Sequence, residues 1–234
     1  MQRYKMQLIK QQISFFVPSV FYGNLQNVLK YFMEKSGSIL DAQPIILPLP
    51  EGAPVEIPKF IMRSKDNTKD LQFKVNRIDM ALVKPYEVGV SESERKTFED
   101  NAIAWILPFA KEFRVLIDRV GVAIQRALIP EGSTTPSEFI SQKYCKQDFL
   151  DQPFRHAKCF EIHCLKKYNY LGHDINSWVR IQTLDILPSM QKVVGVLNDL
   201  NHLPQKTSLT EEGIKSFIKG TNDESLQILK FYQL

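Results

Sequence analysis

Apolar residues recur with two different periods near the start of the chain. Residues 13–17 are β-branched, aromatic or small and stop at Pro18, which predicts a first strand. Across residues 25–33 the apolar positions follow the helical spacing, with Asn24 placed to cap the first turn and Gly37 just beyond the end. A strand followed by an amphipathic helix is therefore expected.

A proline-containing connector comes next. Residues 39–47 are expected to form a strand, and the stretch after them carries Pro48, Pro50, Pro54 and Pro58. Because proline lacks an amide donor, this stretch cannot be a central strand and is predicted to be extended. It either lies across its own sheet or presents extended backbone to an aromatic groove. We favour the first, since these apolar side chains gain from burial: Ile45, Ile46, Leu47, Val55 and Ile57.

Residues 60–62 and 71–83 flank the turn-prone residues 66–68 and predict a hairpin. Within its second arm the apolar residues change parity. Because side chains on a strand alternate between faces, this change predicts a β-bulge near Asn76 and Arg77.

A long helix is predicted after the hairpin. Ser91 and Glu94 match a capping box, and an apolar stripe runs through residues 98–113 at helical spacing. Pro108 lies inside that stripe and is expected to kink the helix.

The second half shows a similar order of patterns. Its expected elements are a strand at 120–129, a short helix at 136–145 that begins with proline, and strands at 159–165, 178–186 and 193–197, the first two joined by a turn at Gly172. Two further capping boxes, Ser208 with Glu211 and Thr221 with Glu224, predict two closing helices.

Both halves thus follow the order strand, helix, three strands, helix. The predicted fold class is α+β, with two pseudo-repeated β-α-β-β-β-α halves, residues 1–117 and 118–234, building a mixed or antiparallel sheet packed on helices. Each half has a sheet face to bury, so we expect one compact domain.

Composition is ordinary for a globular protein. The 234 residues are 44% hydrophobic and 24% charged, enough apolar material for a core without disulfides or metals. Three cysteines, an odd number within a short stretch, favour a reducing compartment. Polar groups interrupt the first ten residues, and the longest apolar run is too short to span a bilayer. We therefore expect a cytoplasmic location and no membrane span. The net charge of +4 is mild and identifies no partner.

The segment around residue 160 holds the densest cluster of reactive side chains. On a strand, Cys159, Glu161 and His163 would share one face, and His173 beyond the turn could add a fourth metal ligand. Residues four apart on a strand are roughly 13 Å apart, however, which is too far for two ligands of one ion. Cys159, His163 and His173 remain metal candidates, against the simpler interpretation of exposed polar residues.

A cysteine nucleophile is a further option. It would pair Cys145 or Cys159 with a nearby histidine, His156, His163 or His173, although no local signature supports such a pair. His202 is interpreted as a loop residue.

The sequence gives no support for nucleotide binding or for catalysis by paired carboxylates. The chain has neither a phosphate-binding G-x-x-x-x-G-K-S/T loop nor a G-x-G-x-x-G motif, so no cofactor is predicted. Two acidic pairs, Glu211–Glu212 and Asp223–Glu224, are assigned to first turns of helices, where negative charge favours the helix dipole.

Residues 143–180 form the most basic and aromatic part of the chain. This mixture suits neutralisation of a nucleic-acid backbone and stacking on bases. The alternative is a solvated sheet face whose aromatic rings pack inward. The candidate nucleic-acid-binding residues are Lys143, Lys146, Arg155, Lys158, Lys166, Lys167, Tyr168, Tyr170 and Arg180.

Four segments carry a resemblance to known sequences: residues 54–58, 76–80, the long aromatic helix and 194–201. Together they resemble a sporadically distributed bacterial family of conserved hypothetical proteins. The resemblance implies a fold and a bacterial or phage context, and it supplies no catalytic residues.

The function expected from the sequence is non-enzymatic. We expect an interaction or regulatory protein, in a bacterial or phage defence or conflict system, that holds a protein partner on an exposed sheet face or edge. Nucleic-acid binding through residues 143–180 and a metal- or thiol-dependent hydrolase stay open as alternatives. Residues 143–180 are equally suited to a homo-oligomer contact.

Overall fold

The computed structural model describes residues 6–17, 24–50, 52–145, 159–186, 190–204 and 209–234. The strands are β1 (Gln7–Phe16), β2 (Ile45–Ile46), β3 (Phe60–Arg63), β4 (Lys69–Phe73), β5 (Arg77–Val83), β6 (Arg119–Leu128), β7 (Glu161–Tyr170), β8 (His173–Ile186) and β9 (Gln191–His202). The helices are α1 (Leu25–Ser36), α2 (Glu92–Glu112), α3 (Pro136–Tyr144) and α4 (Glu211–Phe231).

All nine strands form one sheet in the order β2-β3-β4-β5-β1-β6-β9-β8-β7, and every neighbouring pair is antiparallel. The α+β class is therefore confirmed, and of the two predicted sheet types the antiparallel one is observed. The first half of the chain supplies β1 to β5 and the second half supplies β6 to β9.

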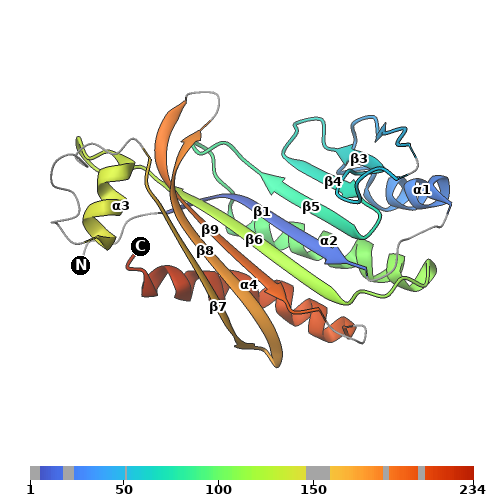
Figure 1. The fold of residues 1–234 in the computed structure, drawn as a ribbon. Coiled ribbons are helices and arrows are strands. Elements are labelled where there is room, and N and C mark those ends of the chain that lie inside the picture. The colour runs from blue at the N-terminus through green and yellow to red at the C-terminus, as the bar shows by residue number, and fades with distance from the viewer. Residues whose placement is uncertain (1–5, 18–23, 51, 146–158, 187–189, 205–208) are drawn as a thin grey trace.

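The four helices pack on the same face of the sheet, with α2 and α4 lying along it (Figure 1). Alternate residues of the central strands face them, as Ile13 of β1 and Val122 of β6 show by their complete burial. Phe109 of α2 contacts Phe32 of α1 at 5.1 Å between ring centres. At the far end of the sheet, Phe139 of α3 packs in a second cluster with β8 and β9.

A buried polar cluster lies between the sheet and the two long helices. On its α2 side, Glu99 accepts a hydrogen bond from Gln11 of β1 at 2.8 Å. On its α4 side, Arg126 of β6 donates to Ser225 at 2.5 Å, and Ser225 donates to Asn198 of β9 at 2.7 Å. The centre of the helix-covered face is thus held by polar as well as apolar contacts.

Helix starts agree well with prediction. Asn24 caps α1, the Ser91–Glu94 capping box opens α2, and Pro136 occupies the first turn of α3. Gly172 has φ +80° in the two-residue turn between β7 and β8, which suits glycine. Helix α2 continues past Pro108 to Glu112.

The described part of the connector forms no central strand, as predicted, but the predicted strand at 39–47 and the predicted burial are wrong. Of residues 39–47 only Ile45–Ile46 pair, as the short edge strand β2. Ile45 and Ile46 are 45% and 56% exposed, and Val55 and Ile57 are also exposed, so this stretch does not bury its apolar side chains. With no strand on the outer side of β2 in the described chain, nothing there covers them.

The predicted β-bulge is a chain reversal instead. Strand β4 ends at Phe73 and β5 begins at Arg77, and the amide of Lys74 donates to the carbonyl of Arg77 at 2.8 Å across a tight turn. The parity of the apolar residues changes because the chain turns back on itself.

The chain closes on one helix rather than two. Thr210 caps α4, with Glu211 and Glu212 in its first turn as predicted. Thr221 lies buried in mid-helix and donates to the carbonyl of Ile218, so it starts no second helix, and Asp223–Glu224 belong to no first turn. Ser208 lies outside the described residues.

No helix in the described ranges is long and apolar enough to cross a membrane.

Candidate binding face of the sheet

No described helix or strand packs on the face of the sheet opposite the helices (Figure 1). At one end of this face Ala127, Ile186 and Val193 are buried in a small cluster with Tyr86 of the β5–α2 connection, and the rest is uncovered. The strand registers place one row of side chains across it, Arg77 opposite Phe16 and Phe16 opposite Arg119. The next row carries Asp79, Ser14, Gly121, Asn201, Asn176 and Lys167. A third contains Asp199 and Trp178, and a fourth contains Lys10 and Arg180. We call this surface the uncovered face.

Arginine and aromatic side chains are paired on this face. The guanidinium of Arg119 lies 3.6 Å from the centre of the Phe16 ring, and that of Arg77 lies 5.4 Å from the same ring. Within the described residues Arg119 makes no ion pair and no hydrogen bond through its side chain. Its donors are therefore free to meet an incoming acceptor.

Asp79 anchors the neighbouring part of the face. It accepts hydrogen bonds from Ser14 at 2.5 Å, from Lys74 at 2.6 Å and from Arg77 at 2.9 Å. Its side chain is only 5% exposed. The Arg77 side chain is thereby held by Asp79 beside the Phe16 ring.

A second arginine–aromatic pair lies two strands away. The guanidinium of Arg180 is 5.6 Å from the Trp178 ring, and its buried Nε has no hydrogen-bond partner among the described residues. Asp199, opposite Trp178, has its pKa raised by burial. Asn201 donates to Asp199 at 2.5 Å.

Gly121 makes room for this arrangement. A Cβ atom at that position would lie 2.0 Å from Oδ1 of Asn201. The glycine therefore lets the Asn201 side chain extend across β6.

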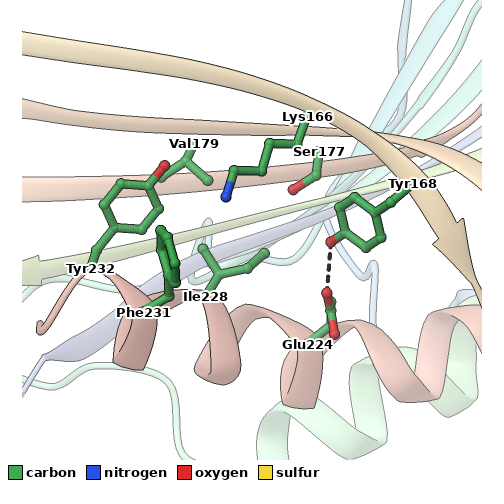
Figure 2. Close-up of a pocket in the computed structure, with 8 residues that line it drawn as sticks. All are labelled: Lys166, Tyr168, Ser177, Val179, Glu224, Ile228, Phe231 and Tyr232. Atoms are coloured by element: carbon green, nitrogen blue, oxygen red, sulfur yellow. Dashed lines mark hydrogen bonds between the residues drawn. The ribbon is translucent and has the colours of Figure 1, made fainter.

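A pocket of about 140 Å³ lies on the other side of the sheet, between β7, β8 and α4 (Figure 2). The ammonium of Lys166 lies 4.2 Å from the Phe231 ring at its rim. Tyr168 donates a 2.6 Å hydrogen bond to Glu224, and burial together with this bond raises the pKa of Tyr168 to about 12. Val179 and Ile228 complete an apolar lining.

The predicted nucleic-acid segment does not form one surface. Lys166, Tyr168 and Tyr170 face α4, and Tyr170 donates to the carbonyl of Gly220 at 2.8 Å. Lys167 and Arg180 face the opposite side, and Lys143 lies on α3. Both tyrosines are engaged with the helix, which limits their use as stacking platforms. Three residues of that set, Lys146, Arg155 and Lys158, lie outside the described residues.

The predicted metal ligands are also separated. His163 lies 3.1 Å from Glu161, and Cys159 contacts the same carboxylate at 3.9 Å. His173, however, is on the helix-covered face, where its ring lies 4.6 Å from the centre of the His202 ring. No group of three or more His, Cys, Asp or Glu residues in the described ranges could hold a metal ion. His156, the other candidate base, lies outside those ranges.

His202 is not a loop residue. It ends β9, is completely buried, and its ring contacts that of Phe217 at 3.9 Å between centres, tilted by 38°. Neither of its ring nitrogens has a hydrogen-bond partner in the described chain. Burial, with a smaller contribution from His173, lowers the pKa of His202 to about 3.

Sequence reasoning missed Arg77, Arg119 and Asp199 as surface candidates. Each alternates with core residues on its strand, which was a usable signal, but their proximity depends on a strand order that the sequence does not state. Comparison with known proteins adds no assignment: no family model matches the chain, and no curated protein matches it either.

Proposed function

We propose that this chain is a non-enzymatic binding protein that holds a protein partner on the uncovered face. One observation carries the proposal: all four described helices pack on the opposite face, while this one presents Arg180 beside Trp178 and Arg119 beside Phe16, and the Arg119 donors have no partner among the described residues. Arginine and aromatic residues are enriched where protein interfaces gain most of their binding energy. Carboxylates on the partner are the groups that these two guanidinium ions fit best.

The distribution of charge favours protein over nucleic acid. Asp70 and Asp199 lie among the cations of this face. A continuous phosphate backbone would pass close to these carboxylates, whereas a protein surface can place isolated acidic groups between them. The Phe16 ring is also already covered by Arg119, so it offers no free face for a base.

The internal duplication belongs to the same proposal. The predicted order of three strands between the helices of each half is wrong for the first half, where the described chain has four, β2 to β5, against three, β7 to β9, in the second. The proposal of two related units rests on the strands running outward from β1 and β6 in both halves. The uncovered face would then be one surface built by both halves. A bacterial or phage defence setting rests on the sequence resemblance alone.

The test is a pull-down from the source cells with wild-type protein and two variants of equal charge change. The double variant Arg119→Glu with Arg180→Glu alters the uncovered face. The control, Lys30→Glu with Lys230→Glu, alters exposed positions on helices. We expect one stoichiometric partner, kept by wild type and control and lost by the arginine variant.

A photo-crosslinking residue locates the contact. Placed at Gln125 on the uncovered face it should link to that same partner, and placed at Gln26 on α1 it should not. Equal retention by the arginine variant would refute the proposal. So would recovery of nuclease-sensitive RNA or DNA in place of a protein.

A further inference from the structure

Strand β7 is a long strand at the edge of the sheet. Its ten residues pair with β8 on one side, and no strand of the described chain pairs with its other side. The opposite edge, β2, has two residues. A long unpaired edge presents a row of backbone donors and acceptors that another strand can join.

The hydrogen-bond phase of β7 identifies the outward-pointing groups. The carbonyl of Phe160 accepts from the amide of Thr183, so even-numbered residues direct their backbone groups toward β8. The odd-numbered residues therefore point outward: Glu161, His163, Leu165, Lys167 and Asn169.

Exposed apolar side chains flank this edge on both faces of the sheet. Leu165 is 41% exposed on the uncovered face. Phe231 is 70% exposed on the helix side, next to Lys166 of β7. Unpaired backbone between exposed apolar groups is typical of a contact surface.

We propose that a second copy of this chain occupies the edge, with β7 pairing antiparallel to β7 of the partner subunit about a two-fold axis at Cys164. Such an axis places Glu161 opposite Lys167 of the partner subunit, twice by symmetry. It also places His163 opposite Leu165 of the partner subunit. The outward-pointing residues supply about eight backbone hydrogen bonds in this register.

Charge selects this register from its neighbours. An axis at Lys166 would bring two lysines face to face, which is unfavourable. An axis at Leu165 would leave Glu161 opposite an asparagine and set His163 against a lysine. Within the described residues Lys167 has no ion-pair partner, and the Glu161 side chain is 47% exposed. The centre at Cys164 is therefore the one that pairs these opposite charges.

Edge pairing of this kind joins two sheets into one. Odd-numbered residues of both copies point to the same side, so the two uncovered faces become a single larger surface. The inference concerns a different part of the molecule from the proposed partner site, and each can fail without the other.

Charge exchange tests the pairing with purified protein. Wild type should sediment as a dimer under reducing conditions, and Glu161→Lys or Lys167→Glu alone should weaken dimerisation by about tenfold or more, because each creates two like-charge pairs. A mixture of the two variants should dimerise again, because each copy then supplies what the other lacks. The combined variant Glu161→Lys with Lys167→Glu should also dimerise.

A neighbouring lysine provides the matched control. Lys166 points to the other face of the strand, so Lys166→Glu, which keeps both Glu161 and Lys167, should dimerise as wild type does, whereas Lys167→Glu should not. Wild type that stays monomeric at high micromolar concentration overturns the proposal, as does a dimer that Glu161→Lys leaves unchanged. Circular dichroism confirms that each variant is folded.

A thiol crosslink tests the register. In an antiparallel sheet, facing residues at a non-hydrogen-bonded site have Cα atoms about 4.5 Å apart, within disulfide range. With Cys145 and Cys159 changed to serine, diamide should oxidise the two Cys164 thiols to a disulfide, taking up two electrons and two protons. A variant that keeps Cys159 alone should stay uncrosslinked. The reverse result would place the axis elsewhere and refute the proposal.

Discussion

Protonation of His202 should destabilise the fold at mildly acidic pH. The side chain is completely buried, both ring nitrogens lack partners in the described chain, and its pKa is lowered to about 3 from 6.5. Between those two values the unfolded chain binds a proton that the folded chain does not. Stability from this group is therefore complete above pH 6.5 and is lost as the pH falls toward 3.

The size of the effect follows from the shift. Each pKa unit corresponds to about 1.4 kcal/mol, so lowering the pH from 7 to 4 should cost about 3 kcal/mol through His202. Replacing it with leucine removes the titrating group and the two unpartnered nitrogens. The difference in unfolding free energy between wild type and His202→Leu should therefore move in favour of the variant by about 3 kcal/mol over that range.

Urea denaturation at pH 7, 5.5 and 4 measures this difference, and other titrating groups cancel because both proteins share them. Intrinsic tryptophan fluorescence reports the transition. Equal m-values in the two proteins would show that the comparison is between similar folded and unfolded states. A difference that stays constant from pH 7 to 4 would refute the reasoning and would mean that the imidazole is solvated or paired.

Four further substitutions, one of them a control, test other parts of the structure by the same assay. Asp79→Asn should lower the unfolding free energy by about 3 to 5 kcal/mol, because it leaves Lys74 buried without its carboxylate. Its control, Glu34→Gln, breaks an exposed ion pair and should change that free energy by less than about 1 kcal/mol. Equal effects of the two substitutions would show that burial of the Asp79 ion pair does not matter. Ser91→Ala removes the side-chain half of a capping box and should cost about 1 kcal/mol; no measurable loss would mean that water caps α2 equally well. Phe109→Ala should cost about 3 to 5 kcal/mol, since the ring is 1% exposed within an aromatic cluster, and a loss under 1 kcal/mol would contradict that packing.

Features set by neighbouring residues could be predicted from the sequence. The caps of α1 and α2 and the first turn of α3 each depend on side chains within four positions of one another. The helical period of α1 likewise needed no knowledge of its partner. Local chemistry was enough to find these elements, although strand ends such as Gln7 and His202 were placed several residues short.

Features that depend on contacts between distant parts of the chain could not be predicted from the sequence. Thr221 resembles a helix cap in sequence, yet the helix continues because α4 buries small polar residues there against the buried polar cluster. Arg126, which donates to Ser225 and Asn222, is about a hundred positions away in the sequence. The exposure of Ile45 and Ile46 likewise follows from the position of β2 at the sheet edge.

The candidate surfaces show the same division. Alternation along one strand placed Glu161 and His163 on one face of β7, and the intervening Ile162 and Cys164 are half-buried against the second core cluster on the other. It could not show that Phe16 and Arg119, from opposite halves of the chain, lie face to face. The nucleic-acid segment was contiguous in sequence but is split by the pleat of β7.

The central pairing of β1 with β6 has a consequence for biosynthesis. Ile13 meets Val122 there, so the middle of the sheet closes across more than a hundred positions of chain. Until β6 (Arg119–Leu128) has left the ribosome, the side of β1 that faces β6 in the folded sheet has no strand to pair with. Folding that depends on such long-range strand pairing is slow, and it leaves an unpaired, aggregation-prone strand edge exposed on the nascent chain. We therefore expect chaperones to bind the nascent chain at the unpaired edge of β1, before α4 has been synthesised.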